Sequence, residues 1–158
     1  MGSRSHIDLA YIAGFLDGDG SLMLQIKKRK DGNKRRFMCT VCFYQDTRHE
    51  KPLFWIRDIF DVGYISRRND GMTELRINGF KRVKEIMAQL LPFIRFKKDQ
   101  AIALHEASVL LSRKTIRNFS TDEIHTLIDC IIKIQSANYV ARKKRTKDEL
   151  MKIFDLTP

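Results

Sequence analysis

The sequence predicts an α+β fold in which a four-stranded antiparallel sheet is covered by helices on one face. Three observations lead to this prediction. Apolar residues follow a helical period near the N-terminus, then alternate with polar residues in two pairs of segments, each joined by a turn, and return to a helical period from Phe80 onward. The expected order of elements is therefore α, ββ, α, ββ, α, followed by further helices.

The composition is that of one globular domain. The chain has 158 residues, of which 43% are hydrophobic, and no apolar run reaches the roughly 18 residues of a membrane span. No linker divides it, so the expected domain covers residues 1–158. The first six residues form a short polar stretch that is compatible with a leader segment. Residues 142–158 are expected to form a basic C-terminal helix.

The first predicted helix, Ile7 to Gly18, is apolar almost all round, which is typical of a helix buried on most sides. Ala10, Gly14 and Gly18 place a stripe of small residues on one face. Such a stripe lets a second backbone come close, and tight packing on the protein's own core explains it equally well. Asp17 and Asp19 stand near the negative end of the helix dipole, where helix stability does not favour carboxylates.

Two hairpins follow. Residues 22–29 and 36–43 alternate between apolar and polar positions around the turn "DGN", and "VGYISRR" and "MTELRIN" repeat the pattern around "NDG". A helix, "PLFWIRDIF", separates the pairs. Later helices are expected over residues 80–91 and 97–111, and from Ser120 or Thr121 to about Ala137.

The net charge points to a nucleic-acid partner. Thirty Lys and Arg residues against 19 Asp and Glu residues give +11, and seven of the basic residues lie between Lys27 and Arg36. A cationic soluble surface is the alternative. A second cluster, five basic residues between Arg142 and Lys147, is equally compatible with a solvated tail or a localisation signal.

The open face of the sheet suits double-stranded DNA. A strand of about ten residues spans about 33 Å, close to one turn of the duplex. Outward side chains can then read base edges in the major groove, while cations at the ends contact phosphates. The residues expected to read bases are Gln25, Arg36, Arg68, Glu74 and Arg76; other outward DNA contacts are Lys27, Arg29, Met38, Thr40 and Ser66; and the phosphate contacts are Lys28, Lys30, Lys34, Arg142 and Lys143.

Several other classes of site are excluded. An EF-hand beginning at Asp17 would need Gly at its sixth position and an acid at its twelfth, where the chain has Leu22 and Lys28. Cys39 and Cys42 would point to opposite faces of a strand, against a zinc site. No phosphate-binding glycine loop is present, so no nucleotide cofactor is expected. Three cysteines indicate a reducing, intracellular location, with an organelle and an archaeal or bacterial cytoplasm both open.

Asp19 is the candidate for metal chemistry on a phosphodiester. Mg²⁺ takes oxygen ligands from only one or two carboxylates, and neighbouring glycines let a DNA backbone approach closely. One carboxylate per chain makes an incomplete site. Two chains that meet along the stripe of Ala10, Gly14 and Gly18 would bring two carboxylates together.

These residues carry a resemblance to a known family. "IAGFLDGDG", Ile12 to Gly20, resembles the motif of the LAGLIDADG homing endonucleases, with identical letters at Ala13, Gly14, Asp17, Asp19 and Gly20. The αββαββα order resembles that family's fold as well. A single copy of the motif resembles the homodimeric branch.

The resemblance implies that motif helices of two subunits pack together, with Ala10, Ala13, Gly14, Asp17 and Gly18 at the interface. It also implies that Asp19 binds a divalent metal, Mg²⁺ or in its place Mn²⁺ or Ca²⁺, and that the Gly18 carbonyl supports it. Asp17 is expected to make local hydrogen bonds at the helix end.

The same resemblance implies roles for two further residues. Gln45 in "YQDT" and Lys97 in "LPFIRFKKDQA" would surround the nucleophilic water, the alternatives being a strand-end hydrogen bond and a surface lysine. His49 stands where relatives often have Arg. The resulting expectation is a homodimeric, Mg²⁺-dependent endonuclease that cuts double-stranded DNA at a long pseudo-palindromic site. An RNA-binding intron maturase and a non-cleaving DNA-binding regulator are the alternatives.

Overall fold

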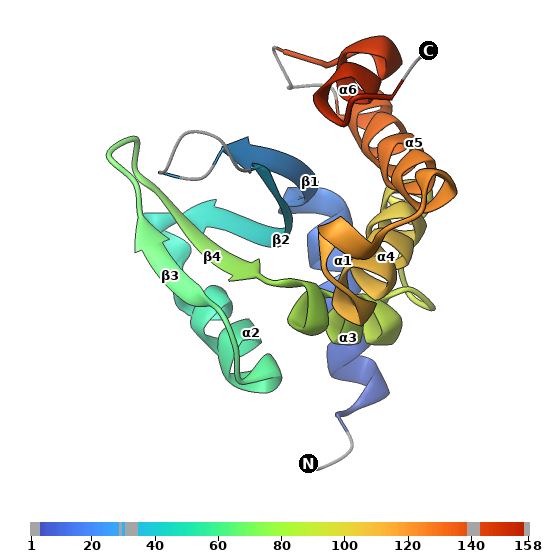
Figure 1. Cartoon of the computed structure of the whole chain (residues 1–158). Helices are drawn as coiled ribbons and strands as arrows, with labels where there is room; N and C mark the ends of the chain where they lie inside the picture. The colour runs from blue at the N-terminus through green and yellow to red at the C-terminus, as the bar shows by residue number, and fades with distance from the viewer. Residues whose placement is uncertain (1–3, 29, 31–34, 139–142, 157–158) are drawn as a thin grey trace.

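The computed structural model describes residues 4–28, 30, 35–138 and 143–156. It confirms the α+β prediction, with one antiparallel sheet in the strand order β1-β2-β4-β3 (Figure 1). The elements are α1 (His6–Asp19), β1 (Gly20–Lys28), β2 (Arg35–Asp46), the 3₁₀ turn η1 (Thr47–His49), α2 (Lys51–Phe60), β3 (Tyr64–Arg67), β4 (Met72–Asn78), α3 (Phe80–Leu90), α4 (Lys98–Arg113), the 3₁₀ turn η2 (Ile116–Asn118), α5 (Thr121–Ala137) and α6 (Lys147–Ile153).

The C-terminal helix is shorter than expected. α6 begins at Lys147 because Thr146 and Glu149 form a capping box, and its first turn carries two acids, so the basic residues 143–145 precede the helix. A second capping box, from Ser120 and Glu123, sets the start of α5 where the sequence predicts it. No helix within the described ranges is long and apolar enough to cross a membrane.

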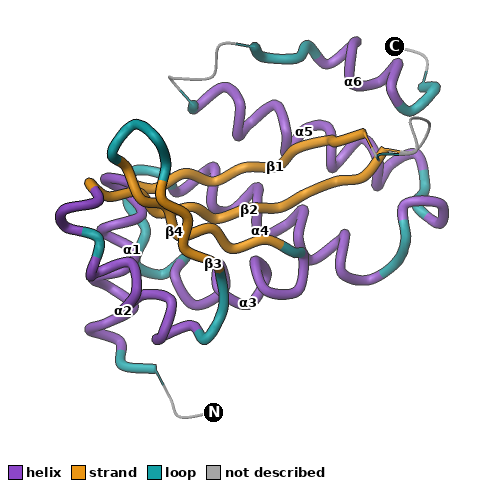
Figure 2. Tube along the Cα trace, turned by 90° about the vertical axis from the view of Figure 1, so that its left-hand side faces the viewer, coloured by secondary structure: helices purple, strands orange, loops and turns teal. Residues whose placement is uncertain are grey.

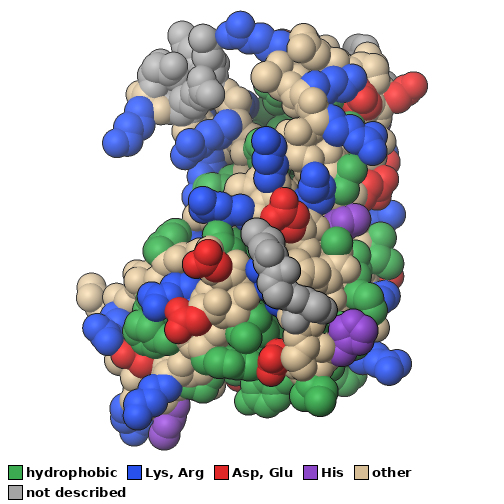
Figure 3. All heavy atoms as spheres, turned by 90° about the horizontal axis from the view of Figure 1, so that it is seen from below, with side chains coloured by type: hydrophobic (Ala, Val, Ile, Leu, Met, Phe, Trp, Pro, Cys, Tyr) green, Lys and Arg blue, Asp and Glu red, His purple; other side chains and the backbone are tan. Residues whose placement is uncertain are grey.

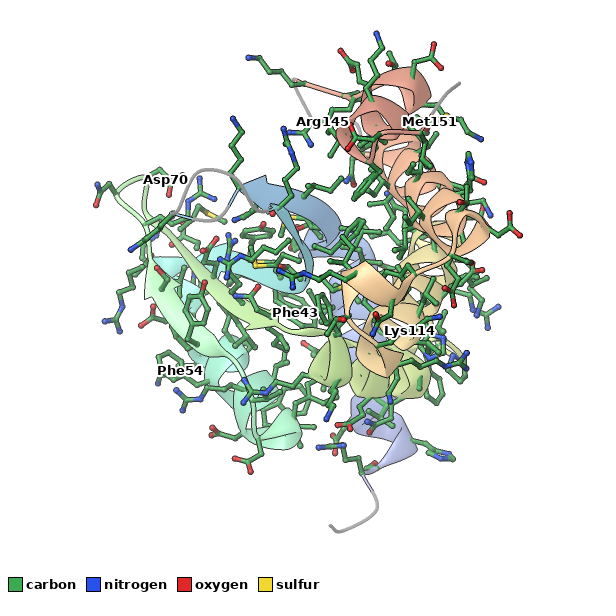
Figure 4. All side chains as sticks on the ribbon, viewed as in Figure 1. Phe43, Phe54, Asp70, Lys114, Arg145 and Met151 are labelled. Atoms are coloured by element: carbon green, nitrogen blue, oxygen red, sulfur yellow. The ribbon has the colours of Figure 1, made fainter. Side chains whose placement is uncertain are left out.

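The helices lie on one face of the sheet. α1, α3 and α4 pack on β2, and α2 packs on β3 and β4, whereas α5 packs against the edge strand β1. Figure 2 shows the four strands running side by side across the front of the molecule, with the helices behind and around them. Phe43 is fully buried between the sheet and the helices (Figure 4). Its ring stacks on that of Phe15 of α1, with the ring centroids 6.1 Å apart. The apolar positions of the strands thus form the core face, as the alternation predicts.

The junction between α1 and β1 requires glycine. A Cβ atom on Gly20 would lie 2.4 Å from Cδ1 and 2.8 Å from the carbonyl oxygen of Leu16. The Gly20 N–H donates to that same carbonyl, so the strand begins directly where the helix ends. This tight junction fixes Asp19, the last residue of α1, at the end of the sheet.

α1 departs from the prediction that it is buried on most sides. Only Leu9, Ile12, Ala13 and Leu16 are buried. On the other side Ile7 is 81% exposed and Tyr11 is 61% exposed. The helix therefore has a second apolar face that no described part of the chain covers.

Candidate active site and nucleic-acid interface

Lys97 binds the C-terminal end of α1. Its Nζ donates to the carbonyl oxygen of Leu16 at 2.8 Å and to that of Asp17 at 2.7 Å, where the negative end of the helix dipole favours a cation. Burial lowers the pKa of Lys97, and the carboxylates of Asp17 and Asp19 oppose that shift. Lys97 is thus no ordinary surface lysine. The structure places its charge at the end of the motif helix, and its role beside the nucleophilic water stays a prediction.

Asp17 anchors the segment that carries Lys97. Its carboxylate accepts backbone N–H groups from Arg95 at 2.7 Å, Phe96 at 3.2 Å and Lys97 at 3.0 Å. The expected hydrogen bonds exist, but the partners are 78 to 80 residues away and are not part of the same helix end. Both carboxylate oxygens accept bonds inside the chain, and the place of Asp17 in a dimer interface stays a prediction.

Replacement of Asp17 by Ala should lower the free energy of unfolding by about 2–4 kcal/mol, because three N–H donors lose a charged acceptor. Urea denaturation followed by Trp55 fluorescence at one protein concentration measures this. Asp8→Ala, on the same helix, is the matched control, since Asp8 makes no side-chain hydrogen bond to any other described residue, and it should cost under about 1 kcal/mol. Equal losses in both variants would contradict the anchoring role.

Asp19 presents a free carboxylate. It is exposed, and no hydrogen bond or ion pair joins its side chain to another described residue. Within the described part of the chain, no group of three or more His, Cys, Asp or Glu side chains forms a metal site. One exposed carboxylate and the nearby Gly18 carbonyl are hard oxygen donors of the kind that Mg²⁺ and Ca²⁺ prefer. A single chain therefore supplies part of a site for a hard cation.

Gln45 lies close to the same junction. Phe43 pairs with Gly20 across the sheet, and Gln45 follows two residues later near the end of β2. Its Oε1 accepts the Asp46 N–H at 2.9 Å, so the strand-end hydrogen bond that was the alternative to a catalytic role is present. Its amide nitrogen makes no bond to another described residue, and the catalytic role stays a prediction. His49 ends η1 and is exposed.

The predicted small-residue stripe lies on the open side of α1. Ala10, Gly14 and Gly18 are exposed, and a Cβ atom at either glycine would meet nothing within 4 Å. Glycine inside a helix costs about 1 kcal/mol relative to Ala, and no contact within the described chain accounts for it. The prediction for Ala13 is wrong. Ala13 lies about 100° around the helix from its neighbour Gly14, and it is fully buried in the chain's own core.

Large apolar side chains surround this stripe. Besides Ile7 and Tyr11, Phe96 is 91% exposed. Tyr11 makes an edge contact with Trp55 of α2 at 5.7 Å, and both line a hollow of about 500 Å³. Seen from below, hydrophobic side chains reach the surface over much of the lower half of this view (Figure 3). We call Ile7, Ala10, Tyr11, Gly14 and Gly18 the open face of α1.

The residues predicted to contact DNA from the sheet differ in their exposure and in their hydrogen-bond partners. Arg68 follows β3 and pairs with Asp70 at 2.7 Å at the tip of the β3–β4 turn (Figure 4). The Oε1 atom of Gln25 is buried beside a hollow of about 300 Å³ between β1 and α5, without a partner among the described residues. Lys28, Lys30, Arg36 and Lys143 are exposed; Lys27, Met38, Ser66 and Arg76 are partly exposed; and Arg29, Lys34 and Arg142 lie outside the described residues.

Two predicted DNA contacts are wrong. Thr40 is 1% exposed and donates to Asn78 Oδ1 at 2.6 Å. Glu74 is 8% exposed and accepts Arg76 Nε at 3.2 Å and Arg76 Nη2 at 3.3 Å. Both side chains lie on the open face of the sheet, as expected. Hydrogen bonds to neighbouring side chains on the sheet bury them, so neither is accessible to DNA. Glu74 instead orients the guanidinium of Arg76.

Comparison with known proteins places this site in a family. The LAGLIDADG endonuclease family model matches residues 12–101. The DNA endonuclease I-CvuI of Chlorella vulgaris is 32% identical over 99 residues, 62% of this chain and 62% of its own length. The DNA endonuclease I-CreI of Chlamydomonas reinhardtii is 28% identical over 149 residues, 93% of this chain and 88% of its own.

A solved structure shares the whole fold. The crystal structure of I-CvuI in complex with its target, obtained in the presence of Ca, superposes with a TM-score of 0.78 at 22% identity, over 97% of this chain and 98% of the other. The family match covers the motif part of α1, both hairpins and Lys97, whose Nζ donates to the end of α1. The chain belongs to the LAGLIDADG endonuclease family.

Proposed function

We propose that two copies of this chain join along the open face of α1 and act as a site-specific endonuclease on double-stranded DNA. The observation that carries the proposal is the end of α1, where the free carboxylate of Asp19 adjoins the uncovered glycines 14 and 18. A second α1 packed on this face would cover the exposed Ile7 and Tyr11 and bring a second Asp19 to the same place. Family membership and the two relatives named as DNA endonucleases support this assignment.

The residues present fit a divalent cation, which we propose is Mg²⁺, with Mn²⁺ or Ca²⁺ able to replace it. When bound, such a cation neutralises phosphate charge and makes a bound water more acidic. Asp19 of each copy, helped by the Gly18 carbonyl, would hold it. Lys97, held at the end of α1, would supply a positive charge to the phosphate, and the free amide nitrogen of Gln45 would orient water.

The basic open face of the sheet would bind the DNA. A two-fold protein reads a two-fold target, so each sheet should follow about one helical turn, and the dimer should cover about 20 base pairs in two related half-sites. Arg76, held by Glu74, is oriented before DNA arrives. A guanidinium fixed in this way suits the bidentate contact to guanine.

Arg76→Ala should therefore relax preference at one position in each half-site, with discrimination falling by about 1–3 kcal/mol. Lys30→Ala, which removes an exposed charge, should lower the binding affinity for all target sequences about equally. A binding scan over single-base target variants compares the two. If Arg76→Ala and Lys30→Ala give the same flat profile, the sheet does not read sequence at Arg76.

The proposed activity is tested on a plasmid library that carries randomised two-fold sites. The wild-type chain should linearise a minority of plasmids in Mg²⁺ and none in EDTA, and the cut sites should share two related half-sites. Retention of specific plasmids without cutting would favour a non-cleaving regulator. Preference for intron RNA over every duplex would favour a maturase, and either result would contradict the proposed nuclease.

A further inference from the structure

A basic groove lies beside the sheet, and Arg36 is the one residue that it shares with the predicted DNA contacts. β4 ends at Asn78, opposite Thr40, while β2 extends back to Arg35 without a partner on that side. The hollow left there measures about 760 Å³ and is walled by the start of α3, the end of α4 and η2. Phe37 and Leu111 contribute to its apolar lining.

The lining of this groove carries six basic residues and no acidic one. They come from three separate parts of the chain: Arg35 and Arg36 from β2, Lys81 and Arg82 from α3, and Arg113 and Lys114 from the end of α4. Only Lys114 (Figure 4) has a described ionic partner, Glu123 at 2.8 Å. No ion pair joins the other five to any described residue. Like charges gathered in one hollow repel each other unless an anion lies between them.

The start of α3 adds to the excess of positive charge in the groove. Gly79 at its N-cap gives no side-chain cap, and the first turn contains Lys81 and Arg82 but no acid. A helix N-terminus favours negative charge, so two cations there do not stabilise the helix. An anion in the groove would satisfy both the helix end and the side chains.

The groove is continuous with the sheet face. Arg36 alternates with Met38 and Thr40 on the open face and also lines the groove. It pairs with Lys27 near the far end of the β1–β2 hairpin, whereas Asp19 lies just before the near end. Eight residue steps separate these ends, about 26 Å at 3.3 Å per residue. A half-site of ten base pairs is about 34 Å long, so on a half-site that begins at Asp19 the groove would face the outer part.

Resting on the proposed function, we propose that this groove binds the sugar-phosphate backbone of the target duplex at the outer end of each half-site. The cations hold phosphates there without reading bases. The groove would thus extend DNA binding beyond the strands and set how long a duplex each chain needs. Lys81, Arg82 and Arg113 lie outside both the basic clusters and the alternating strands of the sequence, so neither feature predicts that they contact phosphates.

The test combines a double variant with a shortened duplex. Arg82→Gln with Arg113→Gln removes two groove charges, and Lys133→Gln with Lys152→Gln removes two exposed charges on α5 and α6 as the control. Binding to a selected target in Ca²⁺ is measured against salt concentration. The slope of log K against log salt should fall by about 0.9 for each phosphate that the variant no longer neutralises, so by about 2 per chain in the groove variant and far less in the control.

A second duplex lacks about four base pairs at each end, which is the outer part of each half-site. This shortening should lower the DNA affinity of the wild type and leave that of the groove variant nearly unchanged. An unchanged salt slope in the groove variant, or full additivity of the two reductions in affinity, would overturn the proposal. Cleavage of the same target by wild type in Mg²⁺ is followed in parallel. If wild type cuts the target and the groove variant binds like the control, only the groove proposal fails. If wild type neither binds nor cuts any duplex, both proposals fail.

Discussion

Asp19→Asn should reduce metal-dependent DNA cleavage by about 100-fold or more while leaving DNA affinity nearly unchanged. The change deletes the one carboxylate at the end of α1 that no described residue engages, and it removes little bulk. Charge stabilisation by a bound metal is worth several kcal/mol, and each 1.36 kcal/mol is tenfold in rate. Cleavage of a selected target is measured under saturating Mg²⁺, and binding is measured separately in Ca²⁺.

The control for this prediction is Asp122→Asn, an equal change of charge at an exposed position in the first turn of α5, which should cut at the wild-type rate. Near wild-type cleavage by Asp19→Asn would show that another group holds the metal. A parallel loss of DNA affinity would show instead that Asp19 acts in binding or folding.

Gly14→Leu should abolish cleavage by separating the two copies while each copy stays folded. A side chain at this position meets nothing within 4 Å inside the chain, and Leu is a better helix former than Gly by up to about 1 kcal/mol. The new side chain would, however, occupy the space that a second α1 needs. Circular dichroism should therefore show a native helix signal, and sedimentation velocity should show a monomer.

Ser136→Leu is the control, because it adds the same kind of bulk to an exposed position on α5. It should remain dimeric and active. An active, dimeric Gly14→Leu variant would contradict the assignment of the interface to the open face of α1.

The sequence predicted most of the fold because its local signals agree with one another. The change of apolar period at Gly20, the "NDG" turn and the Ser120 cap each have a physical cause within a few residues. The turn expected at "DGN" lies outside the described residues. The bounds expected for β4 and the start of α5 accordingly match the structure. The prediction of the C-terminal helix start was wrong, since charge alone does not mark a helix start and the capping box at Thr146 does.

The site was harder to predict from the sequence. Alternation places Glu74 and Thr40 on the correct face, but it does not show that neighbouring side chains bind them and bury them. The bonds from Asp17 to residues 95–97 cross about half of the chain and leave no local pattern. The motif letters also grouped Ala13 with Gly14, although helical geometry turns the two toward different surroundings.

The proposed active site forms only if two chains meet along the open face of α1. Sedimentation equilibrium of the wild-type protein at micromolar concentration, without DNA, tests this directly. We expect a species of about twice the chain mass of 18.5 kDa. A folded species at the mass of a single chain would contradict the shared active site.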